Sequence, residues 1–230
     1  MDKLPQADSG DEEGMQVASV DSSSEGVYLT IDNARALDEL MIEFSSASSF
    51  VIHLETISEK FTIPNLLGIV LSPTLGRAYY VPVEDKGQVW ASGLPLELVM
   101  SRLRPIIEST NIAKVAHDGK REMMLLATYG IRLNNLGFDT MLAAYLLGEK
   151  SLGLRTLALS RMGIEMMPAR SGDTELACHA VDVTGRLSEI LKVELEKKGL
   201  WKLFTKVEMP LIPVLASMER NGVALDMDLL

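Results

Sequence analysis

The alternation of hydrophobic and polar positions predicts strands first and helices later. Short apolar runs rich in β-branched residues predict strands at Val27–Ile31, Phe50–Leu54, Leu66–Leu71, Ala78–Pro82 and Lys114–His117. Apolar residues at helical spacing predict helices after Asp32 or Asn33 and at Leu94–Glu108, Asp118–Tyr129, Gly137–Leu147, Leu154–Met162, Glu175–Lys197 and Thr205–Arg220. Strands joined by helical crossovers indicate a mixed α/β sheet flanked by helices.

Polar residues at the ends of these runs have simple structural roles. Asp32 or Asn33 is expected to cap the first helix, and Asp139 to cap the helix that it opens. Gly130 is expected to end the helix before it. Asp139 therefore needs no catalytic role, and His117, at the end of a short strand, is expected to be a hydrogen-bonded structural residue.

Residues 1–26 differ from the rest of the chain in composition. Seven acidic residues and one lysine give residues 1–25 a net charge of −6, out of −10 for all 230 residues. A segment this polar has little surface to bury, so residues 1–26 are predicted to be a disordered acidic linker. The other 205 residues carry −4 and show no dense basic stripe, which argues against tight DNA binding by this chain alone.

Length, cysteine content and hydropathy restrict the class of protein further. A chain of 230 residues with 47% hydrophobic residues fits one domain with a sizeable core plus tails. One cysteine, Cys178, excludes an intrachain disulfide framework. No apolar run approaches the roughly 20 residues of a membrane span. A cytoplasmic location without membrane contact is expected.

The segment Lys206–Asp226 resembles the helix that opens the polymerase domain of bacterial family A DNA polymerases. The strands and helices before it carry further landmarks of the 3′–5′ exonuclease domain of that family, at Leu67–Ser72, Ala78–Val83, Lys114–Lys120, Tyr129–Ile131 and Phe138–Leu147. The resemblance covers residues 27–230. It implies a ribonuclease H-like fold of the DEDD exonuclease type, with an exonuclease-like domain at 27–204 and the start of the polymerase domain at 205–230.

Catalysis in this family implies two divalent metals held about 4 Å apart by four acids from three motifs. The first motif, Asp-x-Glu, is His53-Leu54-Glu55 here. Spacing of two along a strand keeps both side chains on one face, so Glu55 is correctly directed. His53 replaces the acid that bridges both metals, and a neutral imidazole cannot bridge two Mg²⁺ ions.

The other two motifs also depart from the family pattern. The second, Asn-x-x-x-Asp, is represented by Asp118 and Glu122; the glutamate is one methylene longer than the usual acid. In the third, Tyr-x-x-x-Asp, the tyrosine position holds Leu176 and the acid position holds Ala180. Asp182 cannot replace that acid, because two residues along a helix turn a side chain by about 200°.

The six positions His53, Glu55, Asp118, Glu122, Leu176 and Ala180 therefore predict a degenerate exonuclease site without a confident catalytic residue. Glu55 and Glu122 are the remaining metal-ligand candidates, expected to be vestigial, so that Mg²⁺ is not expected to bind in this chain. The predicted function is an inactive exonuclease-like scaffold of a DNA polymerase acting in replication or repair. Its expected partners are the polymerase domain of the same chain and, through the full-length enzyme, DNA; a monomer is expected.

Two alternatives stay open at this point. An active exonuclease could use His53, Glu55 and Glu122 with Mn²⁺. A non-catalytic single-strand-binding module would need a basic groove with aromatic platforms, and aromatic residues make up only 5% of the chain. The scaffold interpretation also predicts that Leu211, Val214, Leu215 and Met218 form a helix packed against both neighbouring domains.

Overall fold

The computed structural model describes residues 26–57, 65–84, 93–168 and 170–222. In these ranges the strands are β1 (Val27–Thr30), β2 (Ser49–Ile57), β3 (Asn65–Thr74), β4 (Arg77–Glu84), β5 (Leu94–Pro95), β6 (Ala113–Ala116) and β7 (Leu136–Asp139). The helices are α1 (Ala34–Ser45), α2 (Leu96–Ile107), α3 (Gly119–Thr128), α4 (Thr140–Leu146), α5 (Leu154–Met162), α6 (Thr174–Lys197), α7 (Trp201–Leu203) and α8 (Met209–Asn221), with a π-helical segment η1 (Phe204–Glu208) between the last two. The predicted linker, residues 1–26, lies almost entirely outside the described residues.

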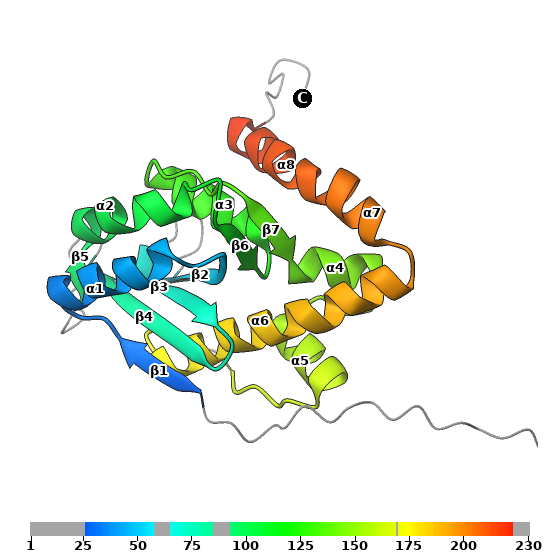
Figure 1. Ribbon diagram of the computed structural model, residues 1–230, viewed down its shortest axis with the longest axis horizontal. Coiled ribbons are helices and arrows are strands. Elements are labelled where there is room, and N and C mark those ends of the chain that lie inside the picture. Colours follow the sequence, from blue (N-terminus) through cyan, green and yellow to red (C-terminus); the bar gives the residue numbers. More distant parts are fainter. Residues whose placement is uncertain (1–25, 58–64, 85–92, 169, 223–230) are drawn as a thin grey trace, which may run out of the picture.

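The described strands form one mixed sheet in the order β1-β4-β3-β2-β6-β7, with β5 beside β4. The β2–β3 and β3–β4 pairs are antiparallel, whereas β1 pairs with β4, β6 with β2, and β7 with β6 in parallel. Helices α1 and α2 lie along one side of the sheet and the long helix α6 along the other (Figure 1). The mixed sheet flanked by helices that the sequence predicts is thus confirmed.

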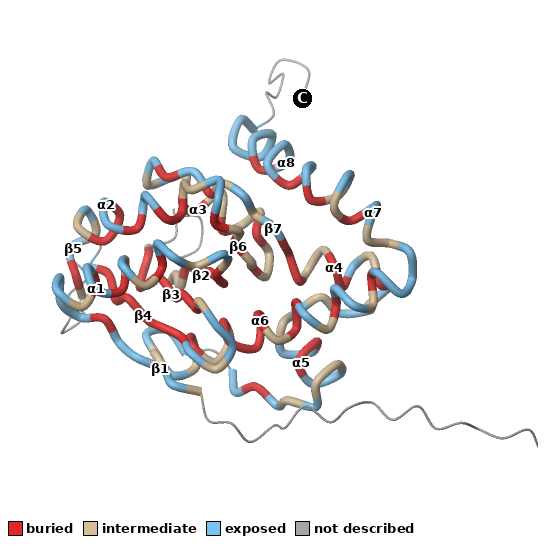
Figure 2. Tube along the Cα trace, in the orientation of Figure 1, coloured by how far each residue is buried: buried red, intermediate tan, exposed pale blue. Residues whose placement is uncertain are grey.

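Successive side chains of β2 point to opposite faces of the sheet, one packed against α1 and α2 and the other against α6. Phe50, Ile52 and Leu54 are buried in the same cluster as the residues of α1 and α2. Val51 belongs instead to the cluster that includes Cys178 of α6. His53 and Glu55 continue the alternation of Val51, so they lie on the face covered by α6. Buried residues follow the inner sides of these elements in Figure 2.

Predicted helix ends agree with the structure where a capping side chain defines them. Asn33 is the N-cap of α1, and its side chain accepts a hydrogen bond from the Ala36 N–H at 2.9 Å. Asp139 caps α4 by accepting from the N–H groups of Met141 and Leu142. Gly130, after α3, has a φ of +69°, a conformation that glycine adopts without steric cost. The predicted caps are confirmed, and Asn33 rather than Asp32 caps α1.

Two predicted helix starts differ from those in the structure. The predicted helix Gly137–Leu147 begins at Thr140, after its predicted cap Asp139, and the residues before it, Leu136–Asp139, form strand β7, because the segment pairs with β6, where Val115 is opposite Phe138. The final helix was expected from Thr205, yet helical structure begins at Trp201 and contains η1. Pro210 explains η1. Proline has no backbone N–H to donate to the carbonyl four residues earlier, and its ring pushes that carbonyl aside, so the helix widens locally to a π-helical turn.

The last helical run leaves the end of α6 and returns across the molecule, where α8 contacts α3 and β7 (Figure 1). Its buried face is made by Met209, Ile212 and Ala216, which are 8%, 6% and 5% exposed. The residues predicted to pack, Leu211, Val214, Leu215 and Met218, are 42–61% exposed. The helix therefore uses a different face against this domain than the sequence predicts, and its apolar outer face is open.

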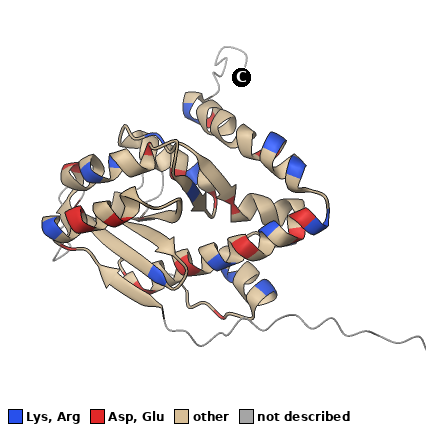
Figure 3. Cartoon of the chain, in the orientation of Figure 1, with Lys and Arg blue, Asp and Glu red and all other residues tan. Residues whose placement is uncertain are grey.

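Basic and acidic residues are mixed along the described helices (Figure 3). Several lie in opposite-charge pairs, such as Arg35 with Glu39 on α1 and Arg104 with Glu108 at the end of α2. None of the described helices has the length and apolar character of a membrane span.

Lys114 is a buried cation whose contribution to stability depends on pH. Its ammonium donates to the Ser109 carbonyl at 2.6 Å, and burial lowers its pKa to about 8 from an ordinary value of 10.5. Between pH 8 and pH 10.5, Lys114 is protonated in the unfolded chain but largely neutral in the folded chain, so the unfolding free energy rises with pH. Below pH 8 the folded chain carries the buried charge, and its full cost to stability is present. Above about pH 10.5 no further gain is expected.

A Lys114→Met variant should lack this pH dependence. We expect wild type to gain about 1 kcal/mol of unfolding free energy relative to Lys114→Met between pH 7 and pH 9.5, as measured by urea denaturation. Lys198→Met, at an exposed position, is the matched control and should follow wild type. A parallel pH profile in wild type and Lys114→Met would refute the assignment.

Candidate active site

His53 and Glu55 lie near the end of β2, on the face covered by α6. The ring of His53 is partly open to solvent, with 36% of its side chain exposed. Its Nδ1 lies 3.0 Å from Oε1 of Glu122, so His53 contacts another predicted site residue. The structure thus brings the first and second motifs together, as the resemblance implies.

Glu122 lies in the first turn of α3, and its side chain is 1% exposed. Its carboxylate is directed at β2. Oε2 accepts from the backbone N–H of Leu54 at 2.9 Å, and Oε1 accepts from Nη1 of Arg121 at 3.2 Å in addition to its contact with His53. Each oxygen of this carboxylate therefore already has a partner within the protein.

Glu55 is also bonded through both oxygens. Oε2 accepts from the Tyr80 hydroxyl at 2.7 Å, and Oε1 accepts from the backbone N–H of Gly172 at 2.9 Å. Burial, followed by the contact with Glu55, raises the pKa of Tyr80, so its hydroxyl stays protonated and donates. The ring of Tyr80 fits against β3 because residue 68 is glycine: a Cβ there would lie 2.5 Å from the ring. Glu55 thus holds β4 and the segment before α6 in place.

The other predicted positions contribute no second carboxylate toward Glu55 or Glu122. Asp118 is the N-cap of α3, with φ +65°, and its side chain accepts from the Arg121 N–H at 3.3 Å. Leu176 and Ala180 are half-buried on α6 and offer no ligand atom in their side chains. The third motif, Tyr-x-x-x-Asp in the family, therefore supplies neither a tyrosine hydroxyl nor a metal-binding carboxylate in this chain.

Asp182 does not replace the acid missing at Ala180. Its carboxylate is buried against the β3–β4 turn, where Oδ1 accepts from the Gly76 N–H at 2.5 Å and Oδ2 accepts from Nε of Arg186 at 3.0 Å. The Tyr28 hydroxyl donates to the same Oδ2 at 3.5 Å. Asp182 thus points away from the Ala180 position, as the helical rotation predicts, and its contacts hold α6 against β1 and the β3–β4 turn.

His117 and Asp139 have structural roles beside the site, as the sequence predicts. Nδ1 of His117 lies 2.8 Å from the Thr140 hydroxyl, and burial lowers the pKa of the imidazole to about 4, so it is neutral at physiological pH. Asp139 also accepts from the Gly119 N–H at 2.7 Å, which links the starts of α3 and α4. Burial raises the pKa of Asp139, and its backbone donors oppose that effect.

Three residues at the site were missed in the sequence. Arg121 stands directly before Glu122, so its position in the second motif could have indicated it. Tyr80 follows an alternating strand pattern that places it on the Glu55 side of the sheet, a weaker signal. Gly172 contacts Glu55 across 117 residues of sequence, and no local pattern indicates such a pairing.

These contacts do not fit a two-metal centre. Hard cations such as Mg²⁺ require several oxygen ligands that converge on one point. Here the oxygens of Glu55 and Glu122 bind donors on different elements, and His53 turns its Nδ1 to Glu122 rather than to a shared centre. Within the described ranges, no group of three or more His, Cys, Asp or Glu side chains is arranged to hold a metal ion.

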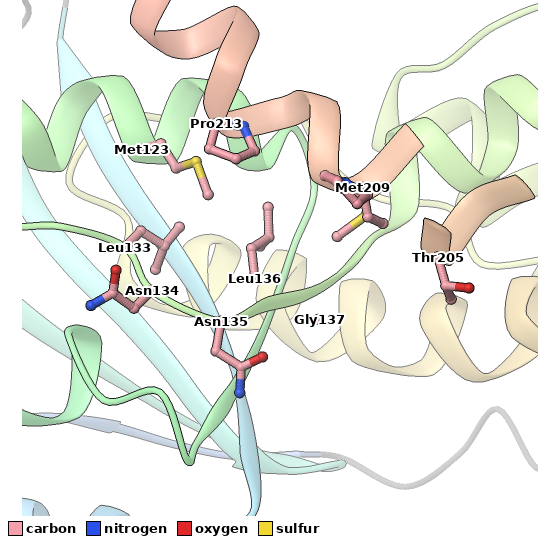
Figure 4. Close-up of a pocket in the computed structure, with 10 residues that line it drawn as sticks. Met123, Leu133, Asn134, Asn135, Leu136, Gly137, Thr205, Met209 and Pro213 are labelled. Carbon is pink, nitrogen blue, oxygen red and sulfur yellow. The ribbon is translucent and has the colours of Figure 1, made fainter. Parts of the chain in front are cut away.

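Among the described residues, open grooves lie between α8 and its neighbours, and one of them is beside the site. An apolar groove of about 440 Å³ lies between α8 and the segment before β7, with Met123, Leu136 and Pro213 directed into it (Figure 4). None of the six predicted site residues lines it. A groove of about 630 Å³ between α3 and the end of α8 is lined by Asp118 and Arg121, and also by Lys120 and Glu219, which form an ion pair.

Comparison with known proteins gives the context of this site. A family model described as 3′–5′ exonuclease matches residues 28–174, a range that ends before Leu176 and Ala180. DNA polymerase I of Chloroflexus aurantiacus is 30% identical over 220 residues, covering 87% of this chain and 23% of the relative. DNA polymerase I of Pseudomonas aeruginosa is 29% identical over 226 residues, covering 88% and 25%. The chain spans about a quarter of the length of these curated relatives.

Solved structures share the fold at lower identity. The polymerase domain of Pol1 from M. smegmatis, in complex with DNA primer-template and dNTP, is similar with a TM-score of 0.67 at 24% identity, covering 86% of this chain and 33% of that one. NrnC of Brucella melitensis has a TM-score of 0.66 at 17% identity, covering 88% and 98%. Escherichia coli RNase D, an exoribonuclease involved in structured RNA processing, has 0.65 at 17%, covering 83% and 51%. The fold is ribonuclease H-like, as predicted.

Proposed function

This chain belongs to the 3′–5′ exonuclease domain family of bacterial family A DNA polymerases, and we propose that in this member the domain is a catalytically inactive scaffold. One observation carries the proposal: the two acids that remain at the site, Glu55 and Glu122, are bonded through every carboxylate oxygen to groups of the protein itself. The positions of the other two acids hold His53 and Ala180. The loss of each bridging or binding acid removes several kcal/mol of transition-state stabilisation. Because about 1.36 kcal/mol corresponds to a tenfold change in rate, two such losses leave little activity.

Metal binding tests this proposal without relying on activity. Mn²⁺ titrated into the chain and followed by electron paramagnetic resonance should show no binding site in the micromolar range. A Glu55→Gln variant should give the same titration as wild type. Stoichiometric binding that Glu55→Gln abolishes would show that the carboxylates exchange their protein donors for metal, and would favour an active exonuclease with a divergent site.

The scaffold role rests on the two faces of α8. Its buried face joins it to α3 and β7, whereas Leu211, Val214, Leu215 and Met218 present an apolar outer face. The polymerase domain of the same chain is the proposed partner of that face, since Lys206–Asp226 resembles the helix that opens it. The full-length protein would then act as a DNA polymerase in replication or repair, as a cytoplasmic monomer, with DNA reached through the polymerase domain.

A pair of substitutions separates the two faces of α8. Ile212→Ala should lower the unfolding free energy of this chain by about 2–4 kcal/mol, because it opens a cavity under the helix. Leu215→Ala, three residues along and 45% exposed, should change it by less than about 0.5 kcal/mol. Urea denaturation measures both, and equal effects of the two substitutions would contradict the assignment of faces.

A further inference from the structure

The buried carboxylate of Glu122 needs a positive charge near it. An ionised carboxylate removed from water is strongly destabilising unless it is paired and hydrogen-bonded. The Leu54 N–H satisfies one oxygen, but a neutral amide brings no charge. His53 contacts the other oxygen through a ring nitrogen that can donate from a neutral imidazole, which brings no charge.

Arg121 supplies a permanent charge at this position. Nη1 of its guanidinium lies 3.2 Å from Oε1 of Glu122 and 3.4 Å from the Leu54 carbonyl, and Nη2 donates to the Thr56 hydroxyl at 2.8 Å. The side chain of Arg121 is 39% exposed, whereas that of Glu122 is 1% exposed, so the guanidinium reaches from the surface to the buried carboxylate. One planar group therefore connects α3 to β2 at the irregularity between Glu55 and Thr56.

We propose that Arg121 is the internal cation of the degenerate site and performs the two structural tasks that divalent metals would perform in a catalytic one. It neutralises the buried acid of α3, and it fixes that helix against the strand that carries His53 and Glu55. The proposal rests on the proposed inactivity, because a metal at Glu122 would compete with the guanidinium for the same oxygen. Arg121 is accordingly a positioning residue, and the site keeps its shape without a bound ion.

The geometry explains why the residue is arginine. A guanidinium is planar and presents several N–H groups in a fixed fork, so it contacts a carboxylate, a carbonyl and a hydroxyl at once. A lysine ammonium carries the same charge as a single point on a flexible stem. Arg121→Lys is therefore expected to keep the charge but lose part of the connection to Thr56.

A double-mutant cycle between Arg121 and Glu122 tests the proposal. In urea denaturation, Arg121→Gln should raise the unfolding equilibrium constant about tenfold when Glu122 is present, because the buried carboxylate loses its charged donor. In the Glu122→Gln background, the same arginine substitution should change that constant by clearly less, about threefold, because only the contacts with the Leu54 carbonyl and the Thr56 hydroxyl remain to be lost. Arg121→Lys should give an intermediate loss in the wild-type background.

The outcomes separate this proposal from the proposed function. Arg35→Gln, which removes an exposed ion pair on α1, is the matched control and should change the unfolding constant by no more than about twofold. Equal effects of Arg121→Gln with and without Glu122 would overturn the role of Arg121, even if the chain has no nuclease activity. Nuclease activity in the wild type would instead overturn the proposed inactivity, whatever coupling the cycle shows.

Discussion

Replacing Phe204 with alanine is expected to lower the unfolding free energy by about 3–5 kcal/mol, the range for removing a fully buried aromatic side chain. Phe204 is 0% exposed, and its ring centroid lies 4.9 Å from that of Phe138 and 5.6 Å from that of Trp201. These rings lie where the last helical run leaves α6 and passes β7. Removing the central ring should therefore loosen the attachment of α8 as well as the core beneath it.

Equilibrium denaturation in urea and amide hydrogen exchange measure this effect. Exchange in α8 should accelerate in Phe204→Ala more than exchange in α1, which belongs to a separate core cluster. Leu203→Ala, at the neighbouring position and 38% exposed, is the control and should cost less than about 1 kcal/mol. A cost below about 1 kcal/mol in Phe204→Ala would show that the aromatic cluster does not hold the helical run in place.

Replacing Asp182 with alanine is expected to cost about 3 kcal/mol, because it breaks a buried, hydrogen-bonded ion pair. The carboxylate bonds the Gly76 N–H in the β3–β4 turn and Nε of Arg186 on its own helix. Gly76 has a φ of +78°, so the turn has a specific conformation that this contact holds against α6. The loss should be measured by urea denaturation at neutral pH.

The amide variant tests whether the turn contact is the source of this effect. Asp182→Asn keeps an oxygen that can accept from the Gly76 N–H, so it should cost clearly less than Asp182→Ala, about 1–2 kcal/mol. If the two variants were equally stable, the turn contact would not be the source of the effect.

Sequence patterns predict the fold well where side chains act locally. Asn33 and Asp139 identify helix starts because their capping bonds reach only two or three residues along the chain. Strand β7 was missed because its four residues form a strand only through pairing with β6, more than 20 residues earlier. The π-helical segment before Pro210 depends on how the backbone hydrogen bonds of the helix adjust to the proline ring, and the spacing of hydrophobic residues carries no information about that adjustment.

The degenerate site is only partly readable from sequence for the same reason. The identities of His53, Glu55, Glu122 and Ala180 follow from aligning motifs, and they are enough to predict which ligands are absent. The partners of the remaining acids are not predictable in this way. Tyr80 reaches Glu55 across two antiparallel strand pairings, and the Leu54 N–H meets Glu122 across 68 residues. Those long-range contacts indicate that the two carboxylates hold elements of the fold together rather than converge as metal ligands.

We propose that this exonuclease-like domain does not cut DNA, and an assay of nucleotide release measures that activity itself. An end-labelled single-stranded oligonucleotide would be incubated with the chain at millimolar Mg²⁺ and, separately, Mn²⁺, beside a Glu55→Ala variant. We predict no release of the 3′-terminal nucleotide by wild type above the level of Glu55→Ala with either metal. Release by wild type that disappears in Glu55→Ala would show that His53, Glu55 and Glu122 assemble a working metal centre, and would contradict the account.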